Sequence, residues 1–410
     1  MERGTRRKWG LEAVSGGEPR PMFSVVIPTF SRLGLLRRAL AAWESQAPGV
    51  DFEVIVADDG STDGTARFLA AWAPARHAYS WFSQANAGPA RARNSALRRA
   101  RGRYVFFAGD DILPTPRLLL EHARVHAREA DPNVVVIGRS SWPPDLPLTA
   151  TMRHIDGPGA EQFGFAWMRN GAEYDFRHFY TSNLSLSREL LEREPDGFSE
   201  EFPRAAYEDI ELSYRLSRHG QRIVYAQHAE AWHVHPYDAR GFFKRQVVCG
   251  AMAATFLRKQ PHLWKWFPGR DLERIRLRLA SERSGSSGPA SDSRKRVETA
   301  EGAALEVAML YDATPAPFLT PLLLGLFRHA VEKGFAEAWY EPDVAARLLL
   351  HSAREATIGP ALGTFVGQAL HHRVRLPDPM VTRVYDALAT PAAQRVDPRP
   401  RADHGTERVA

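Results

Sequence analysis

Short apolar runs alternate with amphipathic stretches along the first third of the chain. The runs have the length of buried strands and cover Phe23–Ile27, Phe52–Ala57, Tyr79–Phe82, Tyr104–Ala108 and Val134–Gly138. Leu33–Trp43 separates the first two runs and Thr65–Trp72 the next two, and both stretches carry apolar residues at helical spacing. A repeated order of strand, helix and strand predicts an α/β fold whose sheet contains parallel strands joined by right-handed crossovers.

The regular pattern weakens after Ser140, where Pro143, Pro144, Pro147 and Pro158 interrupt a stretch rich in glycine and aromatic residues. Long irregular segments in compact enzymes tend to be functional, so we expect a lid that crosses one face of the domain. Periodic segments then return, namely a strand pattern at Tyr180–Leu186, a helix at Glu208–Arg218, a strand at Arg222–Ala226, and helices at Gly241–Leu257 and Leu272–Leu279.

The last third of the chain shows helical periodicity and little strand signal. Ser281–Arg296 is rich in serine, glycine and charge, which is typical of a linker. We therefore expect a disordered tail at 1–21, an α/β domain at 22–265 with halves at 22–130 and 131–265, a helix and linker at 266–296, an all-helical module of five helices at 297–392, and a disordered tail at 393–410.

The composition allows a large core and favours anionic partners. The chain has 410 residues, 44% of them hydrophobic and 25% charged, which fits two or three globular domains. Its net charge of +6 suits nucleotide phosphates or an acidic membrane surface. Clusters of arginine are often only solvated helix faces, so we expect no nucleic-acid partner.

Cysteine content and hydropathy bear on the compartment. The single cysteine, Cys249, excludes an internal disulfide. Residues 1–20 contain no apolar core of signal-peptide length, and the longest apolar run, Phe318–Phe327, is about half of the roughly 20 residues that a membrane span needs. We therefore expect a cytoplasmic protein, with a peripheral position on the inner face of the membrane as the alternative.

The run Tyr104–Ala108 ends in Gly109 and two adjacent acids, Asp110 and Asp111. Ligands of α/β proteins usually bind where strands end, and two neighbouring carboxylates repel each other unless a cation compensates them. Mg²⁺ or Mn²⁺ bridged to phosphate oxygens would supply that cation. The alternative is an acidic turn, a position in which aspartate is common.

The second run ends in a turn of aspartate, glycine and serine that opens a helix, from Asp58 to Thr65. Asp59 could accept the ring N–H of a nucleobase, and Phe30, which follows Pro28 and Thr29 at the end of the first run, could stack on the base. The structural alternative is a helix cap with glycine for tight turning.

A small-residue loop, Asn86–Asn94, leads into a basic helix before the Asp110–Asp111 strand. Gly88 allows close backbone approach, and Arg91 or Arg93 could pair with phosphate oxygens. An exposed basic helix face would explain the same residues.

A cluster of acids and a pair of histidines follow in the second half of the α/β domain. Glu208 and Asp209 begin a helix, where the helix dipole favours acids, and either carboxylate could accept a proton from a substrate hydroxyl. His233 and His235 lie two residues apart, on one side of an extended segment, and imidazole joins carboxylates in binding Mn²⁺ more readily than Mg²⁺.

In this order, the motifs resemble those of the family 2 glycosyltransferases with the GT-A fold. The resemblance rests on Val25–Phe30, Asp58–Ser61, Asn86–Asn94, Gly109–Asp111, Glu208–Asp209, and His233 with His235, and it covers about residues 22–261. It implies an α/β fold with a Rossmann-like mixed sheet flanked by helices, here followed by the helical module. It also implies a nucleotide-sugar donor, with a UDP-sugar favoured over a GDP- or dTDP-sugar, and a saccharide or lipid-linked acceptor.

The resemblance further implies roles for single residues. Pro28, Phe30 and Asp59 would hold the base, Arg91 or Arg93 would approach the diphosphate, and Asp110 would lie near the ribose. Asp111 would coordinate Mn²⁺ or Mg²⁺, with His233 or His235 as a further metal or phosphate contact. Asp209 would be the general base of an inverting displacement, with Glu208 beside it.

Two departures from the common family pattern refine the expectation. The metal motif is Gly109-Asp110-Asp111 rather than Asp-x-Asp, and the Gln-x-x-Arg-Trp motif of processive relatives does not follow Asp209. We therefore expect a nonprocessive enzyme that adds one sugar per encounter, and we expect the helical module to bind a partner protein or the membrane surface.

Three other classes of protein fit the sequence less well. A nucleotidyltransferase would need a glycine-rich, basic loop after the first strand, and a dinucleotide-dependent oxidoreductase would need Gly-x-Gly-x-x-Gly there; Pro28-Thr29-Phe30-Ser31 supplies neither. A noncatalytic nucleotide- or sugar-binding subunit would be favoured only if the acids were replaced.

Overall fold

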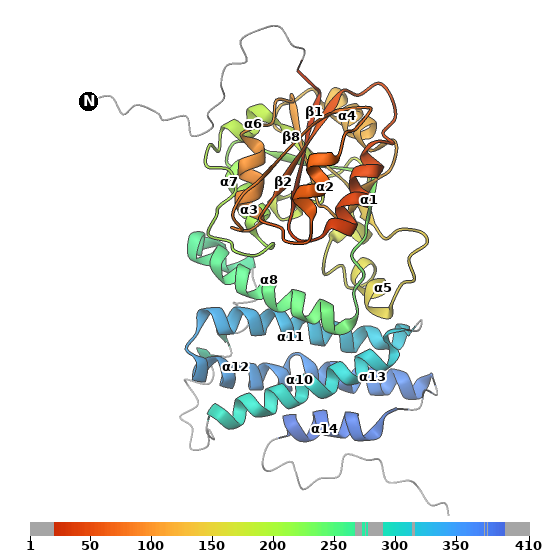
Figure 1. Ribbon diagram of the computed structural model, residues 1–410. Helices are drawn as coiled ribbons and strands as arrows, with labels where there is room; N and C mark the ends of the chain where they lie inside the picture. The colour runs from red at the N-terminus through yellow and green to blue at the C-terminus, as the bar shows by residue number, and fades with distance from the viewer. Residues whose placement is uncertain are drawn as a thin grey trace, which may run out of the picture.

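The computed structural model describes residues 20–266, 273–274, 276–277, 290–313, 316–372, 374 and 376–389. The predicted tails lie almost entirely outside these residues, as does most of the helix expected at Leu272–Leu279. In the described part, the chain forms a layered α/β domain, a long helix beneath it and a stack of helices below that helix (Figure 1).

One sheet of nine strands forms the centre of the α/β domain. Its order is β3-β2-β1-β4-β8-β6-β9-β5, and β7 pairs with β9. The strands are β1 Phe23–Thr29, β2 Phe52–Asp58, β3 Ala78–Ser83, β4 Tyr104–Ala108, β5 Ile112–Pro114, β6 Val134–Ser141, β7 Glu173–Tyr174, β8 Asn183–Ser187 and β9 Arg222–His233. The five apolar runs of the first third all form strands, as predicted.

The sheet is mixed, which confirms the predicted fold class. β3, β2, β1 and β4 are parallel, as are β6 and β9, whereas β8 runs antiparallel to both β4 and β6. Parallel pairing, expected from the alternation of strands and helices, therefore holds on either side of β8. The long excursion between β6 and β8 lets the chain re-enter the sheet from its other end.

Alternating residues of the strands bury against helices on both faces of the sheet. On one face Val25 and Ile27 pack with α1 Leu33–Trp43, α2 Thr65–Ala71 and α4 Leu118–Glu129. On the other face Val26 packs with the remaining helices of this layer, α3 Pro89–Leu97, α6 Arg188–Glu192 and α7 Glu208–Ser217. The two-residue period of a strand produces this division directly.

The irregular segment between β6 and β8 contains little regular structure beyond α5 Ala150–Asp156 and β7. It crosses the edge of the sheet where the strands end, and Glu161, Gln162 and Phe163 line a cavity there. Its position fits the expected lid.

The C-terminal module contains five α-helices among the described residues, as predicted. They are α10 Ala290–Asp312, α11 Thr320–Trp339, α12 Pro342–Glu355, α13 Ile358–His371 and α14 Asp378–Leu388. Because α10 begins at Ala290, residues 290–296 are helical, and the predicted extent of the linker is wrong there. The polar composition concealed a buried stripe in which Ser293 and Val297 face the other helices.

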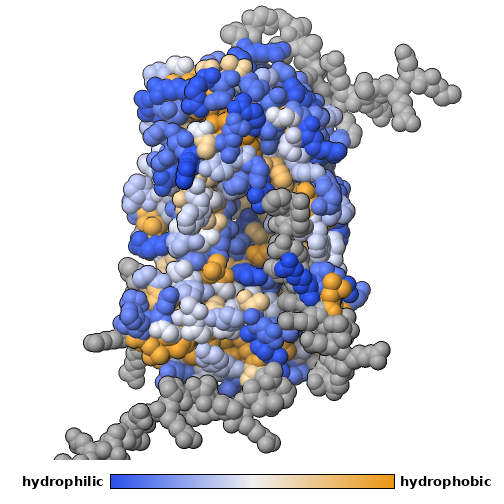
Figure 2. Space-filling model, turned by 180° about the vertical axis from the view of Figure 1, so that it is seen from behind, coloured by the Kyte–Doolittle hydropathy of each residue, from blue (hydrophilic) through white to orange (hydrophobic). Residues whose placement is uncertain are grey.

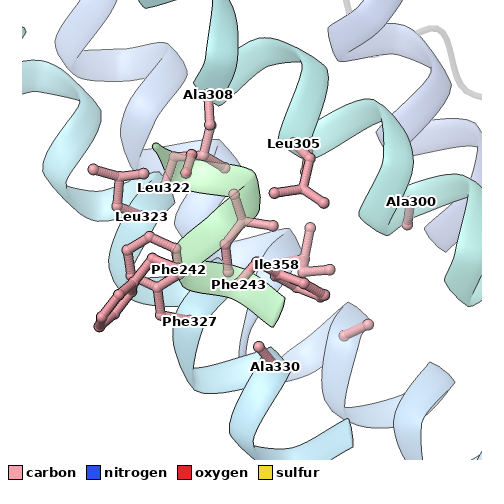
Figure 3. Close-up of a cluster of buried hydrophobic side chains, with 14 of the residues drawn as sticks. Phe242, Phe243, Ala300, Leu305, Ala308, Leu322, Leu323, Phe327, Ala330 and Ile358 are labelled. Carbon is pink, nitrogen blue, oxygen red and sulfur yellow. The ribbon is translucent and has the colours of Figure 1, made fainter. Parts of the chain in front are cut away.

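A long helix, α8 Ala239–Lys259, lies between the sheet layer and this module (Figure 1). The expected boundary at residue 265 assigns α8 to the α/β domain, yet its apolar face contributes to the core of the helical module. Phe242 and Phe243 of α8 meet Leu305 of α10 and Phe327 of α11 in one buried cluster (Figure 3). Helix α8 therefore belongs to both parts.

Buried Asp312, at the end of α10, also connects the two parts. Its carboxylate oxygens accept the backbone N–H groups of Thr151 in α5 and Ala239 in α8, at 2.7 and 2.9 Å. One side chain of the helical module thus caps the N-terminal ends of two helices that precede it in the chain. Among the described helices, none is both long and apolar enough to cross a membrane.

Candidate active site

The ends of β1, β2, β4 and β9 open onto a cavity of about 690 Å³. The cavity is lined from the sheet, the irregular segment and α8. Predicted site residues on its wall are Pro28, Phe30, Asp59, Arg93, Asp110, Asp111, Glu208, Asp209, His233 and His235. Of the candidates taken from the sequence, Arg91 alone does not line it. The fold therefore gathers motifs that are more than 200 residues apart into one chamber.

The adjacent acids share one cation. Arg32 donates from Nη1 to Asp110 Oδ1 and from Nη2 to Asp111 Oδ2, both at 2.8 Å. Thr29 Oγ1 donates to Asp110 Oδ2 at 2.7 Å. Burial raises the pKa of Asp110 to about 6, with a further contribution from the Asp111 charge, while Arg32 and Thr29 oppose the rise. The pair therefore needs positive charge, as its sequence predicted.

Asp111 also meets both predicted histidines. Its Oδ2 lies 3.0 Å from His235 Nδ1 and 3.4 Å from His233 Nε2. Burial by itself would raise the pKa of Asp111, but the histidines and Arg32 hold it well below the usual value. One potential ligand atom from each of the three residues lies within 4.8 Å of the others. A carboxylate and two imidazoles at this spacing suit a divalent transition metal.

Short-range pairing places these three residues. Strand β5 follows Asp111 directly and pairs antiparallel with β9, so that Ile112 lies opposite His233. The backbone N–H of Val234 donates to the Asp111 carbonyl at 2.8 Å. The alternation of an extended chain then turns His233 and His235 to the same side.

Aromatic rings enclose the two imidazoles. Trp142 stacks on His233 with ring centroids 5.9 Å apart, and Phe163 lies at the same distance from that ring. Tyr237 stacks on His235 at 4.6 Å. These rings come from the irregular segment and from the turn before α8, so they limit access of water to Asp111.

The residues expected to hold a nucleobase, Pro28, Phe30 and Asp59, line the cavity at the ends of β1 and β2. The side chain of Phe30 is 49% exposed, which leaves its ring free to stack. Asp59 is buried, and its carboxylate accepts N–H groups from Ala87, Gly88 and the Gln84 side chain at 2.8 to 3.1 Å. Asp59 thus holds the Asn86–Asn94 loop against β2, a role that the helix-cap interpretation did not include.

The two arginines of the basic helix have different environments. Arg91 is exposed on the outer surface, with its Nε 4.0 Å from Glu200, and the structure gives no support to its expected contact with phosphate. Arg93 is buried, and its Nη1 donates to Glu208 Oε1 at 2.8 Å. A buried charge needs a paired acid, so Glu208 orients Arg93 along the cavity wall.

The pairing of Arg93 with Glu208 distinguishes the two acids at the start of α7. Asp209 accepts the N–H of Ile210 at 2.8 Å. Burial raises the pKa of Asp209 to about 7, the neighbouring Glu208 charge adds to the rise, and Arg93 opposes it. Tyr207, just before them, has φ of +65°, an unusual value for a bulky residue that turns the chain into the cavity. A carboxylate with this pKa suits proton transfer near neutral pH.

Arg32 and Arg245 line the cavity but were not among the residues selected from the sequence. Arg32 lies three residues after the end of β1. Because the sequence already places the end of this strand at the site, a basic residue there could have been predicted to line it. Arg245 lies inside the helical pattern of α8, where no local signal separates it from a solvated face.

Comparison with known proteins agrees with this geometry. Residues 24–192 match the family model described as glycosyl transferase family 2. The matched part of the α/β domain, residues 24–192, belongs to this family. The match runs from β1 through β8 and includes the Asp110–Asp111 pair, and it stops before Glu208, Asp209 and the two histidines.

Several glycosyltransferases are similar to this chain. Validoxylamine A glucosyltransferases from two subspecies of Streptomyces hygroscopicus, jinggangensis and limoneus, are among them. Their identities are 29% and 30%, over alignments that cover 59% of this chain. These alignments cover 62% and 58% of the relatives, so the chain spans less than two thirds of their length. Chondroitin synthase of Escherichia coli is 27% identical over 59% of this chain and 39% of its own length.

Among solved structures, the mannosyltransferase PcManGT from Pyrobaculum calidifontis is similar at 21% identity. The TM-score is 0.47, and the match covers 90% of this chain and 86% of that one.

Proposed function

We propose that the protein is an inverting, nonprocessive and metal-dependent glycosyltransferase that moves a sugar from a nucleoside-diphosphate sugar to an acceptor hydroxyl. The observation that supports this most is the single 690 Å³ cavity that holds both the Asp110–Asp111 pair and Asp209. A compensated acid pair suits a metal-bound diphosphate, and a carboxylate of raised pKa suits the acceptor hydroxyl.

The residues present fit a divalent ion. Asp111, His233 and His235 would hold it, since their ligand atoms already converge and Asp110 beside them is also negative. Mn²⁺ suits the two imidazoles better than Mg²⁺ does, and either ion would supply positive charge to the departing diphosphate. Phe30 and Asp59 would bind the base, and a UDP-sugar is the favoured donor.

Asp209 would perform the proton transfer. The acceptor oxygen forms a bond to the anomeric carbon, its proton passes to a carboxylate oxygen of Asp209, and the bond from that carbon to the diphosphate oxygen breaks. A single displacement inverts the configuration at the anomeric carbon. Glu208 remains paired with Arg93, so Asp209 is the carboxylate available for the proton.

A panel of UDP-, GDP- and dTDP-sugars, each with and without Mn²⁺, tests this proposal by release of nucleoside diphosphate. Asp111→Ala should abolish Mn²⁺-dependent turnover and weaken the binding of UDP with Mn²⁺ in calorimetry. Asp209→Asn should lower transfer about 10²- to 10⁴-fold, the usual contribution of a general base, while UDP affinity stays nearly the same. Unchanged transfer by Asp209→Asn would exclude it as the base.

We also propose that the helical module binds a partner protein or the membrane surface. Its exposed large apolar residues support this, namely Leu310, Leu324, Val344 and Leu370. On the face that Figure 2 shows, apolar residues gather toward the end of the molecule formed by this module. Cosedimentation of the full chain with anionic vesicles tests membrane binding, and copurification with light scattering tests partner binding. A protein that stays monomeric, purifies alone and does not bind vesicles would contradict the proposal.

A further inference from the structure

One wall of the cavity comes from the helix layer beneath the sheet rather than from the α/β domain itself. Arg245, Gln246 and Cys249 of α8 line the cavity, as does Val331 of α11. These side chains face the chamber between the donor-side strands and the helical module. The family 2 match ends at residue 192, so this wall lies wholly outside it.

Arg245 differs from the cavity arginines that pair with acids. Arg32 binds Asp110 and Asp111, and Arg93 binds Glu208. In the described part of the chain, no carboxylate lies within ion-pair distance of Arg245, and its Nη1 instead donates to Cys249 Sγ at 2.7 Å. A thiol is a weak acceptor, so most of the guanidinium's five donors remain available.

Arg245 lines the same cavity as Glu208 and Asp209 at the start of α7. Helix α8 packs against this start, since the ring of Tyr207 lies 5.9 Å from that of Phe256 in α8. Burial opposes the charge of Arg245, but Cys249, Tyr237, Glu208 and Asp209 outweigh burial and raise its pKa. Glu208 and Asp209 are thus among the charges that act most strongly on Arg245. In a single displacement, the group bound beside the base belongs to the acceptor, because the diphosphate leaves from the opposite face.

From this placement we infer that Arg245 binds an anionic group of the acceptor, a carboxylate or a phosphate close to the attacking hydroxyl. This inference rests on the proposed function, because only a transferase has an acceptor. A planar guanidinium matches both anions with two parallel hydrogen bonds, whereas a neutral sugar would leave a half-buried cation without a counter-charge. Gln246, buried beside it, offers an amide for a neighbouring hydroxyl.

Three probes of matched shape test the inference, namely glucose, glucuronate and glucose 6-phosphate. Calorimetry on the full chain saturated with UDP and Mn²⁺ should show that one anionic probe binds at least tenfold more tightly than glucose. Glucuronate and the phosphate ester distinguish a carboxylate acceptor from a phosphate acceptor. In Arg245→Met the preference should fall below threefold.

Lys244→Met is the matched control, because Lys244 is the exposed neighbour on α8 and the substitution removes the same charge. It should keep the preference of the unmodified protein. The inference is overturned if the unmodified protein shows no preference for either anion, or if Arg245→Met retains it.

Two further readouts separate this inference from other roles of Arg245. A tenfold loss of UDP affinity in Arg245→Met would make it a diphosphate ligand and overturn the acceptor role. An equal loss of transfer to charged and neutral acceptors, with a shifted pH profile, would make it a positioning residue for Asp209. If no nucleotide sugar is hydrolysed but the anion preference is found, the proposed function fails and the anion site stands.

Discussion

Single residues of the site acquire their chemistry from a few long-range pairings. Arg93 forms an ion pair with Glu208, and Arg32 forms ion pairs with Asp110 and Asp111. The pairing of Arg93 with Glu208 leaves only one of two adjacent acids free for another task, whereas Arg32 bridges both acids of its pair. At the start of α7 the free acid is Asp209, and the choice between Glu208 and Asp209 depends on a helix more than 100 residues earlier.

Asp209 predicts a pH dependence of transfer. Its pKa is raised to about 7 by burial and by Glu208, and only the ionised carboxylate can accept the acceptor's proton. The transfer rate should therefore rise with pH up to about 7, fall about tenfold per unit below that, and level off above. The kcat profile at saturating substrates measures this.

Arg93→Met provides the companion measurement. This substitution removes the Arg93 charge, which lowers the pKa of Asp209. The rising limb of the pH profile should therefore move to higher pH. A rising limb near pH 4 in the unmodified protein would contradict the raised pKa of Asp209. A limb near pH 7 that does not move in Arg93→Met would assign the limb to another group.

At the scale of elements, α4 and β8 are joined by a buried pair of histidines. His122 Nε2 donates to Asn183 Oδ1 at 2.9 Å, and its Nδ1 lies 2.8 Å from Ser185 Oγ. His126 Nε2 lies 2.8 Å from the same hydroxyl. Burial lowers the pKa of His122 to about 4 and that of His126 to about 3. Both are therefore neutral in the folded protein.

These histidines predict a loss of stability in acid. The unfolded chain takes up protons at its histidines below pH about 6.5, whereas the folded protein does not, so the free energy of unfolding falls with decreasing pH. Each histidine contributes a slope of about 1.4 kcal/mol per pH unit, until its folded pKa is reached.

Urea denaturation between pH 7 and pH 4.5 measures the slope. His126→Phe, which keeps the ring stacked on Tyr104, should reduce the slope by about half of the pair's contribution. His228→Phe, at an exposed position of β9, is the control and should leave it unchanged. An identical slope in all three proteins would assign the acid sensitivity to other groups.

Helices α8 and α11 approach closely where each has a glycine. A Cβ added at Gly334 would lie 1.8 Å from the Val247 carbonyl oxygen, and one added at Gly250 would lie 2.0 Å from that of Val331. Gly334→Ala must therefore push the helices apart, and overpacking of this kind typically costs about 1–3 kcal/mol.

Gly363→Ala is the matched control for this crossing. Gly363 is exposed inside α13, and an added Cβ would meet nothing within 4 Å. The better helix propensity of alanine should stabilise that variant by about 0.5–1 kcal/mol. Chemical denaturation of the two variants should give shifts of opposite sign, and a stabilising Gly334→Ala would contradict the observed crossing.

At the scale of the whole molecule, the α/β domain and the helical module share one core. Ala150, Met152 and Phe202 of the α/β domain belong to the same buried cluster as Leu305 and Phe327 of the module. Together with the caps that Asp312 provides, this core makes α8 a common element rather than a tether.

The shared core predicts that both parts unfold together. Calorimetry should show one transition whose van't Hoff and calorimetric enthalpies agree, although chains of two domains commonly show more than one. Asp312→Ala should lower the single transition as a whole by about 0.5–2 kcal/mol, the usual cost of a lost helix cap. Asp343→Ala, at an exposed position of α12, is the control. Two separated transitions would contradict a common core.

Local patterns were enough to predict most elements of this protein. The strand runs, helix α1, the five helices of the module and the two carboxylate pairs each follow from spacings of two to four residues, which any segment displays by itself. The linker was predicted too long because the composition at 290–296 is polar, while the buried face of α10 appears only once its neighbours are in place.

The sequence by itself determined the class of fold, the order of the two parts and the residue types at the strand ends, because periodicity and strand-end acids are local properties. The tertiary structure decided which acids pair with Arg32 and Arg93, placed Arg91 outside the cavity, and brought Arg245 of α8 into the same cavity as Asp209. Such pairings join residues tens to hundreds of positions apart, and no local spacing records them. Only the packing of α8 between the two parts gives Arg245 a place in the site.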